Sequence, residues 1–149
     1  MIDPSVFRRY SFFDGLEQEQ IDSILPLMVN EAYEAGTDII EEGGYSNKLW
    51  FILEGRAAVV KGGIILMELE EGSVFGEMEI LDTEPVAATI KTLAATKVMS
   101  LSLDALGEIY DSDLKTYSFL LMNLARDLSR RLRRMDSKLV RESPAMDWN

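Results

Sequence analysis

The turn around Gly76 has the residue types of an anion-binding site. A glycine lets backbone N–H groups approach an anion closely, and the first turn of a helix directs such donors toward it. Glu77 follows directly, and its carboxylate can accept hydrogen bonds from hydroxyl groups of a ligand. This segment therefore predicts a small-molecule site at the start of a helical turn.

The composition excludes several other kinds of chemistry. The chain has no cysteine and no histidine, which rules out disulfides, zinc fingers, iron–sulfur clusters and serine–histidine catalytic triads. We therefore expect no catalytic residues, no metal site and no enzyme activity. The net charge of −11 also disfavours nucleic acid as a partner of the whole surface.

Residues 31–103 have the sequence pattern of short strands separated by tight turns. Apolar or alternating runs of four to eight residues alternate with glycines, and the pair Gly62-Gly63 indicates a two-residue hairpin. The predicted strands are 31–35, 38–41, 48–53, 56–61, 64–69, 87–92 and 97–101. So many short strands in one block predict a mostly β fold with flanking helices, a β-roll or jelly-roll of the double-stranded β-helix kind.

Helical patterns flank this block, so that the 149 residues form one expected domain, 1–149. Two short helices are predicted within 1–30, and C-terminal helices within 104–142. Asp104 can cap the first C-terminal helix, and Ser112 or Asp113 can cap a long one over 113–141. Leu114 and Met135 begin and end a stripe of apolar residues spaced seven apart. Such a heptad stripe predicts a homodimer through this helix, although it can also pack only on its own domain.

The long helix also carries nearly half of the basic residues. They are Arg126, Arg130, Arg131, Arg133, Arg134, Lys138 and Arg141. A solvated helix surface explains them better than an RNA or lipid patch does. The sequence shows neither a transmembrane segment nor a secretory signal, so that a cytoplasmic protein without membrane contact is expected.

Three stretches together resemble the cyclic nucleotide-binding domain family, which includes the sensor half of catabolite-activator-type regulators. They are residues 34–43 (EAGTDIIEEG), 48–57 (KLWFILEGRA) and 72–89 (GSVFGEMEILDTEPVAAT). The resemblance implies a cAMP or cGMP effector and a phosphate-binding cassette, in which a Pro-Arg pair follows Phe-Gly-Glu. It also implies that Glu77 binds the ribose.

The cassette departs from the family pattern at two positions. Val86 follows Pro85 where the family has the arginine that binds the cyclic phosphate, and Glu79 stands where the family has a small residue. A missing charge-assisted pair costs about 1.5–3 kcal/mol, and a second carboxylate would repel the phosphate. We therefore expect weak or no binding of classical cyclic nucleotides.

The residues of the degenerate cassette are the candidate ligand site. They are Phe75, Gly76, Glu77, Met78, Glu79, Pro85, Val86, Ala87 and Ala88, with Met135 and Asp136 as possible contacts to a base. A purely structural interpretation is equally open. In it Phe75 and Gly76 shape a turn, Glu77 is a solvated or capping acid and Val86 belongs to the core.

Two functions follow from this sequence. The first is a regulatory, ligand-sensing domain whose effector is a cyclic nucleotide or another small molecule. The alternative is a ligand-free homodimer that binds another protein. The DNA-binding relatives carry a helix-turn-helix domain after the long helix, and too few residues follow here for one, so that direct DNA binding is not expected.

Overall fold

Two four-stranded antiparallel sheets form the centre of the computed structural model, which describes residues 3–82 and 84–145 apart from the side chains of 78–80. One sheet has the order β1-β8-β3-β6 and the other β2-β7-β4-β5. The strands are β1 (Val29–Tyr33), β2 (Asp38–Ile40), β3 (Lys48–Glu54), β4 (Ala57–Lys61), β5 (Ile64–Leu69), β6 (Val74–Phe75), β7 (Thr89–Thr92) and β8 (Thr96–Ser102). The predicted β-roll with flanking helices is confirmed.

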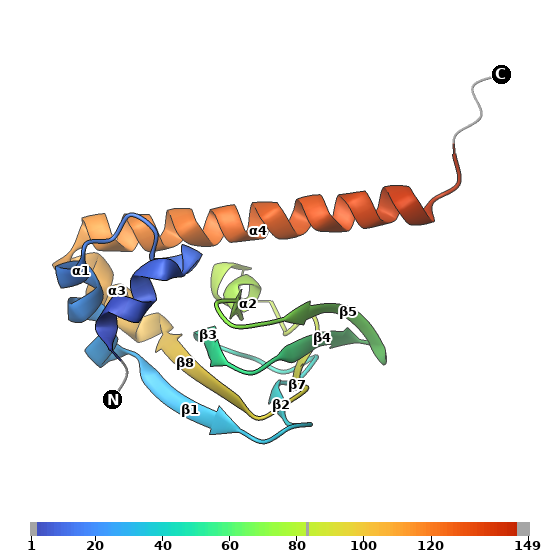
Figure 1. The fold of residues 1–149 in the computed structure, drawn as a ribbon, viewed down its shortest axis with the longest axis horizontal. Coiled ribbons are helices and arrows are strands. Elements are labelled where there is room, and N and C mark those ends of the chain that lie inside the picture. Colours follow the sequence, from blue (N-terminus) through green and yellow to red (C-terminus); the bar gives the residue numbers. More distant parts are fainter. Residues whose placement is uncertain (1–2, 83, 146–149) are drawn as a thin grey trace.

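Helices gather at one end of the roll and along one side of it (Figure 1). The N-terminal ones are the 3-10 helices η1 (Pro4–Arg9), η2 (Ser11–Phe13) and η3 (Leu25–Leu27) and the α-helix α1 (Gln18–Ile24). The others are α2 (Glu77–Asp82), α3 (Leu103–Ser112) and α4 (Leu114–Glu142). The prediction of two short N-terminal helices was too simple, because half of residues 4–27 forms three short 3-10 helices and only Gln18–Ile24 forms an α-helix.

The hairpin between β4 and β5 has the predicted two-residue turn. Lys61 pairs with Ile64 across it, and Gly62 and Gly63 have φ angles of 56° and 77°. Positive φ at both central residues gives the turn whose twist matches that of the strands, and glycine adopts it without strain.

Strand β3 separates two hydrophobic cores, because side chains alternate between the two faces of a strand. Leu49, Phe51 and Leu53 point into the core beneath the helices. Trp50 and Ile52 point into the second core, between the sheets. β3 is thus buried on both faces, which accounts for its run of consecutive apolar residues.

Phe51 holds the N-terminal segment against the roll. Its ring lies 5.0 Å from the ring of Tyr10, 6.2 Å from that of Phe12 and 5.6 Å from that of Phe13. Such aromatic pairs contribute beyond the area that they bury. At the rim of this cluster, burial and a hydrogen bond with Glu71 raise the pKa of Tyr10.

Side-chain caps define where the C-terminal helices begin. Asp113 caps α4 by accepting from the Thr116 N–H at 3.1 Å, and hydrogen bonds with Thr116 lower the pKa of its carboxyl group. Ser102, and not the predicted Asp104, caps α3 by accepting from the Ala105 N–H at 3.0 Å. Asp104 instead lies in the first turn, where a negative charge favours the helix dipole.

Helix α4 is fixed to the domain by its first half. The buried Asn123 donates from Nδ2 to the carbonyl oxygens of Phe12 at 2.8 Å and Asp14 at 2.9 Å. Leu120 and Leu124 are buried in the core beneath the helices. The second half passes over the roll and extends beyond it (Figure 1).

The described helices are too short or too polar to cross a membrane.

Candidate functional site

The candidate site begins at the turn from β6 into α2. Gly76 has a φ of 84°, and a Cβ atom there would lie 2.7 Å from the Lys48 carbonyl oxygen and 2.8 Å from Cδ1 of Trp50. Both the left-handed backbone and the close approach of β3 therefore require glycine. This turn places Glu77 at the first position of α2, facing α4.

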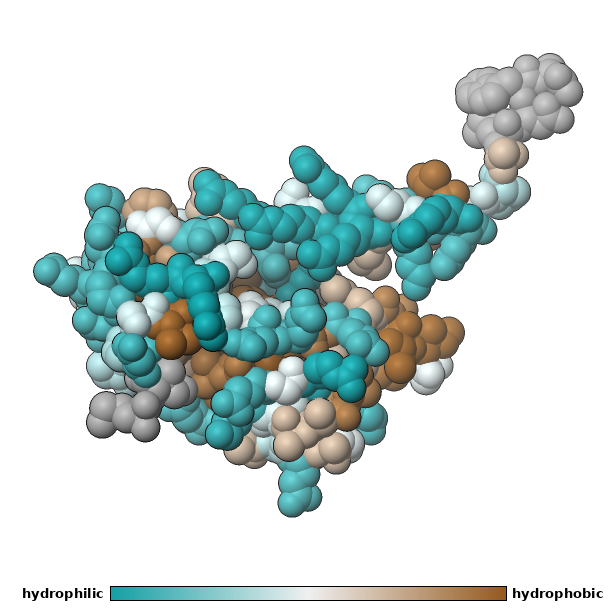
Figure 2. Space-filling view, viewed as in Figure 1, coloured by the Kyte–Doolittle hydropathy of each residue, from teal (hydrophilic) through white to brown (hydrophobic). Residues whose placement is uncertain are grey.

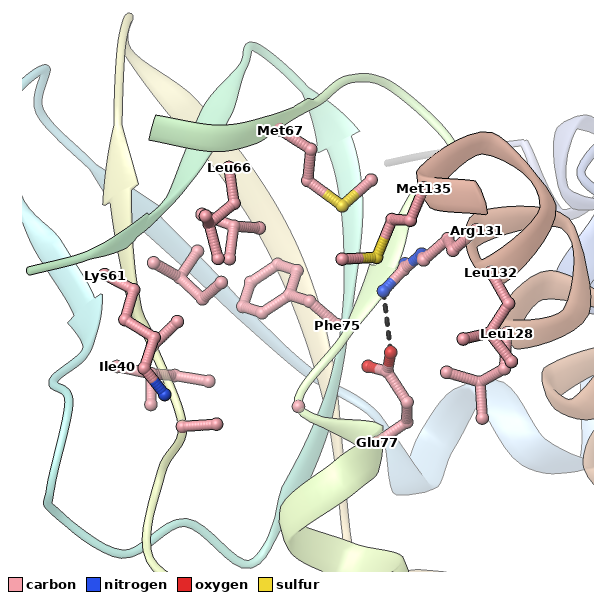
Figure 3. A pocket seen from close by; sticks show the side chains of 15 residues that line it. Ile40, Lys61, Leu66, Met67, Phe75, Glu77, Leu128, Arg131, Leu132 and Met135 are labelled. Atoms are coloured by element: carbon pink, nitrogen blue, oxygen red, sulfur yellow. Dashed lines mark hydrogen bonds and ion pairs between the residues drawn. The ribbon is translucent and has the colours of Figure 1, made fainter. Parts of the chain in front are cut away.

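A cavity of about 400 Å³ lies between the roll, this turn and α4 (Figure 3). Most of its lining is aliphatic or aromatic. The lining residues are Ile40, Val59, Lys61, Leu66, Met67, Phe75, Gly76, Glu77, Ala87, Ala88, Ile90, Leu128, Arg131, Leu132 and Met135. The volume is that of a small-molecule site with a few polar groups among apolar walls.

Glu77 and Arg131 form a nearly buried ion pair at one end of the cavity (Figure 3). Arg131 Nη1 lies 2.6 Å from Glu77 Oε1, and the two side chains are 14% and 5% exposed. The guanidinium also donates to the carbonyl oxygen of Val74. A charge-assisted bond in such a shielded place is stronger than an exposed one. The carboxylate that would receive a ligand hydroxyl is therefore already engaged by α4.

Asp127, one helical turn before Arg131, provides a second negative charge. Its Oδ2 lies 2.9 Å from Arg131 Nη2 and forms an ion pair with it. This buried oxygen accepts no hydrogen bond from the described residues. Asp127 lines a separate polar groove of about 310 Å³ on the other side of Arg131, which lines both spaces.

The structure brings most of the predicted site residues to the cavity. Phe75, Gly76, Glu77, Ala87, Ala88 and Met135 line it. The exposed Pro85 and Asp136 are not among its lining residues. The side chains of Met78 and Glu79 lie outside the described part of the structure.

Val86 does not line the cavity, contrary to one of the two interpretations of the sequence. Its side chain is buried in the core between the sheets. Its backbone pairs with the turn at residues 43–44, since Val86 N–H donates to the Gly44 carbonyl at 2.8 Å and Gly43 N–H donates to the Val86 carbonyl at 2.9 Å. Position 86 thus holds an apolar side chain in the core. In the structural interpretation Glu77 is a solvated or capping acid, and its burial excludes the solvated acid.

Arg131 was not singled out as a site residue by sequence reasoning. It was assigned with its neighbours to a solvated helix surface, and that assignment is wrong for Arg131 alone among these basic residues. Its spacing offers one signal: it lies three residues after Leu128 and four before Met135, on the apolar stripe. The partner Glu77, 54 residues earlier, could not be inferred from spacing.

No group of three or more acidic residues suited to a metal ion occurs among residues 3–82 and 84–145.

Comparisons with known proteins agree with this fold. The family model of the cyclic nucleotide-binding domain matches residues 30–113, more than half of the chain. A cyclic nucleotide-binding domain from Methylobacillus flagellatus superposes with a TM-score of 0.85 at 22% identity, over 95% of this chain and 83% of that one. The Thermus thermophilus catabolite activator protein gives a TM-score of 0.74 at 26% identity, over 87% of this chain and 61% of that one.

Sequence relatives are much longer than this chain. A cGMP-dependent protein kinase of Toxoplasma gondii is 32% identical over 98 residues, which are 66% of this chain and 10% of the kinase. Glutaminase 2 of Bradyrhizobium diazoefficiens is 30% identical over 125 residues, which are 83% of this chain and 20% of that protein. On the family model and the shared fold, this chain belongs to the cyclic nucleotide-binding domain family.

Proposed function

We propose that this domain is a non-catalytic ligand sensor that binds cAMP and cGMP weakly or not at all. The observation that carries the proposal is the charge arrangement of the cavity. Position 86 supplies a core side chain in place of an arginine, and Glu77 is paired with Arg131. A cyclic nucleotide would lack one charge-assisted contact and would compete with a guanidinium for Glu77.

The expected loss of affinity follows from the missing contact. A charge-assisted hydrogen bond contributes about 1.5–3 kcal/mol, and each 1.4 kcal/mol changes the dissociation constant about tenfold. Affinity for a cyclic nucleotide should therefore be about ten to a hundred times weaker than in a cassette that has its arginine.

Calorimetric titration with cAMP and cGMP tests this expectation. Phe75 and Ile90 belong both to the core that holds Val86 and to the cavity wall, so that an arginine at position 86 is long enough to extend toward the cavity. We expect no micromolar binding by the wild-type domain, and binding at least about tenfold tighter by Val86→Arg than by Val86→Met. The methionine variant is the matched control, because it has a long side chain without the charge. Both variants are first checked for a cooperative thermal transition. Micromolar affinity of the wild type for either nucleotide would show that the arginine is dispensable.

The second proposal is a homodimer through the C-terminal half of α4. Leu132, Met135 and Leu139 lie on one side of this half and are 61%, 51% and 61% exposed. Apolar side chains spaced three and four apart form the seam of a coiled coil. The first half of the stripe is occupied within the domain, where Leu124 is buried. A second copy of α4 presents the same apolar side chains and is therefore the expected partner of this exposed face.

Sedimentation equilibrium of Leu139→Glu measures the contribution of the seam. A charge in an apolar seam should weaken dimerisation at least about tenfold, because a carboxylate loses hydration there. Ser137→Glu is the control, since it adds the same charge to an exposed position about 200° around the helix. A wild-type domain that is monomeric at all concentrations, or equal effects of the two variants, would refute the seam.

A further inference from the structure

Two cations lie at opposite ends of the cavity, with apolar side chains between them (Figure 3). Arg131 is at the α4 end, and Lys61 comes from the last position of β4, just before the hairpin turn. Leu66, Met67 and Phe75 are among the side chains between these ends. A ligand that fills this cavity must therefore present an apolar body to most of the wall.

One of the two cations has carboxylate partners and the other has none among the described residues. Arg131 is paired with Glu77 and Asp127. Lys61 has no carboxylate within 4.0 Å among the residues that the structure describes. Arg131 already has two carboxylate partners, so Lys61 is the cation of the lining that no described carboxylate neutralises. One negative charge on the ligand would neutralise Lys61.

We propose that the cavity binds a small organic monoanion with an apolar body, whose anionic group pairs with Lys61. This ligand class rests on the proposed sensing function, which it makes more specific. Since Glu77 is held by Arg131, such a ligand needs no hydroxyl groups. Lys61 is exposed and retains its hydration until the anion arrives, so that it accepts an anion without first breaking an ion pair.

The alternatives fit the cavity less well. A ligand with a sugar diol would have to share Glu77 with Arg131, in a place that is shielded from solvent. An uncharged apolar ligand would bury the same wall but would gain no charge-assisted contact with Lys61. A cation would be repelled by Lys61.

A pair of fluorescent probes separates the charge from the apolar body. 8-Anilinonaphthalene-1-sulfonate carries one sulfonate, and N-phenyl-1-naphthylamine has the same aromatic body without it. We expect the wild-type domain to bind the sulfonate more tightly than the neutral probe. Lys61→Met should lower this preference about fivefold, and Lys61→Arg should retain it, as expected for one partly exposed ion pair.

A third variant shows that both probes report on the cavity and not on the exposed part of α4. Ala88 lines the cavity, so that Ala88→Trp should fill it and abolish the binding of both probes. If the wild-type domain bound both probes equally, or if Lys61→Met kept the preference for the sulfonate, the proposed monoanionic ligand would be wrong. The domain would then sense a ligand of another chemical class. Absence of binding by the wild type, or binding that Ala88→Trp leaves intact, would overturn both the ligand class and the sensing function.

Discussion

Phe51→Ala should lower the free energy of unfolding by about 3–5 kcal/mol, the usual cost of removing a buried phenylalanine ring. The side chain is 1% exposed and contacts three other aromatic rings. Its replacement by alanine leaves a cavity beneath η1 and η2, which these short 3-10 helices cannot close without losing their own contacts. Urea denaturation followed by circular dichroism measures the change.

Tyr45→Ala serves as the control for Phe51→Ala, because it removes an aromatic ring that is 82% exposed. A surface substitution of this kind should change the free energy of unfolding by no more than about 0.5 kcal/mol. If Phe51→Ala cost as little as Tyr45→Ala, the aromatic cluster would not be what holds the N-terminal segment to the roll.

Arg131→Met should be the other strongly destabilising change, because it leaves the buried Glu77 without its cation. Breaking a buried ion pair by removing one partner costs about 3–5 kcal/mol, and the partial exposure of Arg131 puts the expected value near the lower end. Methionine keeps most of the length of the side chain, so that the change tests the charge more than the packing. Urea denaturation again gives the measurement.

The double variant Glu77→Gln/Arg131→Met separates the ion pair from the packing of α4. With both charges gone, part of the lost stability should return, because no charge is left unpaired at Glu77, whereas Asp127 still lacks its partner Arg131. Arg130→Met is the matched control, since this neighbouring arginine is exposed and forms no ion pair among the described residues. Strictly additive effects of the two single substitutions would show that Glu77 and Arg131 do not stabilise each other.

Local patterns predicted most of the roll. The pair Gly62-Gly63 and the apolar runs on either side of it give the β4–β5 hairpin, and the bounds of β5 are those expected from the sequence. Strand β6 was missed, because its two residues, Val74 and Phe75, are too few to show any alternation. It exists only because Trp50 and Phe51 of β3 pair with it, which is a tertiary cause.

The candidate site was less accessible to sequence reasoning than the fold. Gly76 and Glu77 could be identified, since their types and order carry the chemistry of the turn. The burial of Val86 depends on its pairing with the distant turn at residues 43–44. The position of Arg131 depends on how α4 crosses the roll. That crossing is set by packing and by the hydrogen bonds of Asn123 to the N-terminal segment, which no repeat or motif encodes.

The alternation of β3 between two cores gives neighbouring residues different surroundings. Phe51 lies in the core beneath the helices, whereas Trp50 lies on the other face and stacks on Phe75 at a centroid distance of 5.9 Å. Phe75 in turn lines the cavity. Trp50 and Trp148 are the two tryptophans of the chain, so that replacing Trp148 by phenylalanine leaves one indole fluorophore. The fluorescence emission of Trp50, which stacks on the cavity-lining Phe75, would then report on the cavity without any added label.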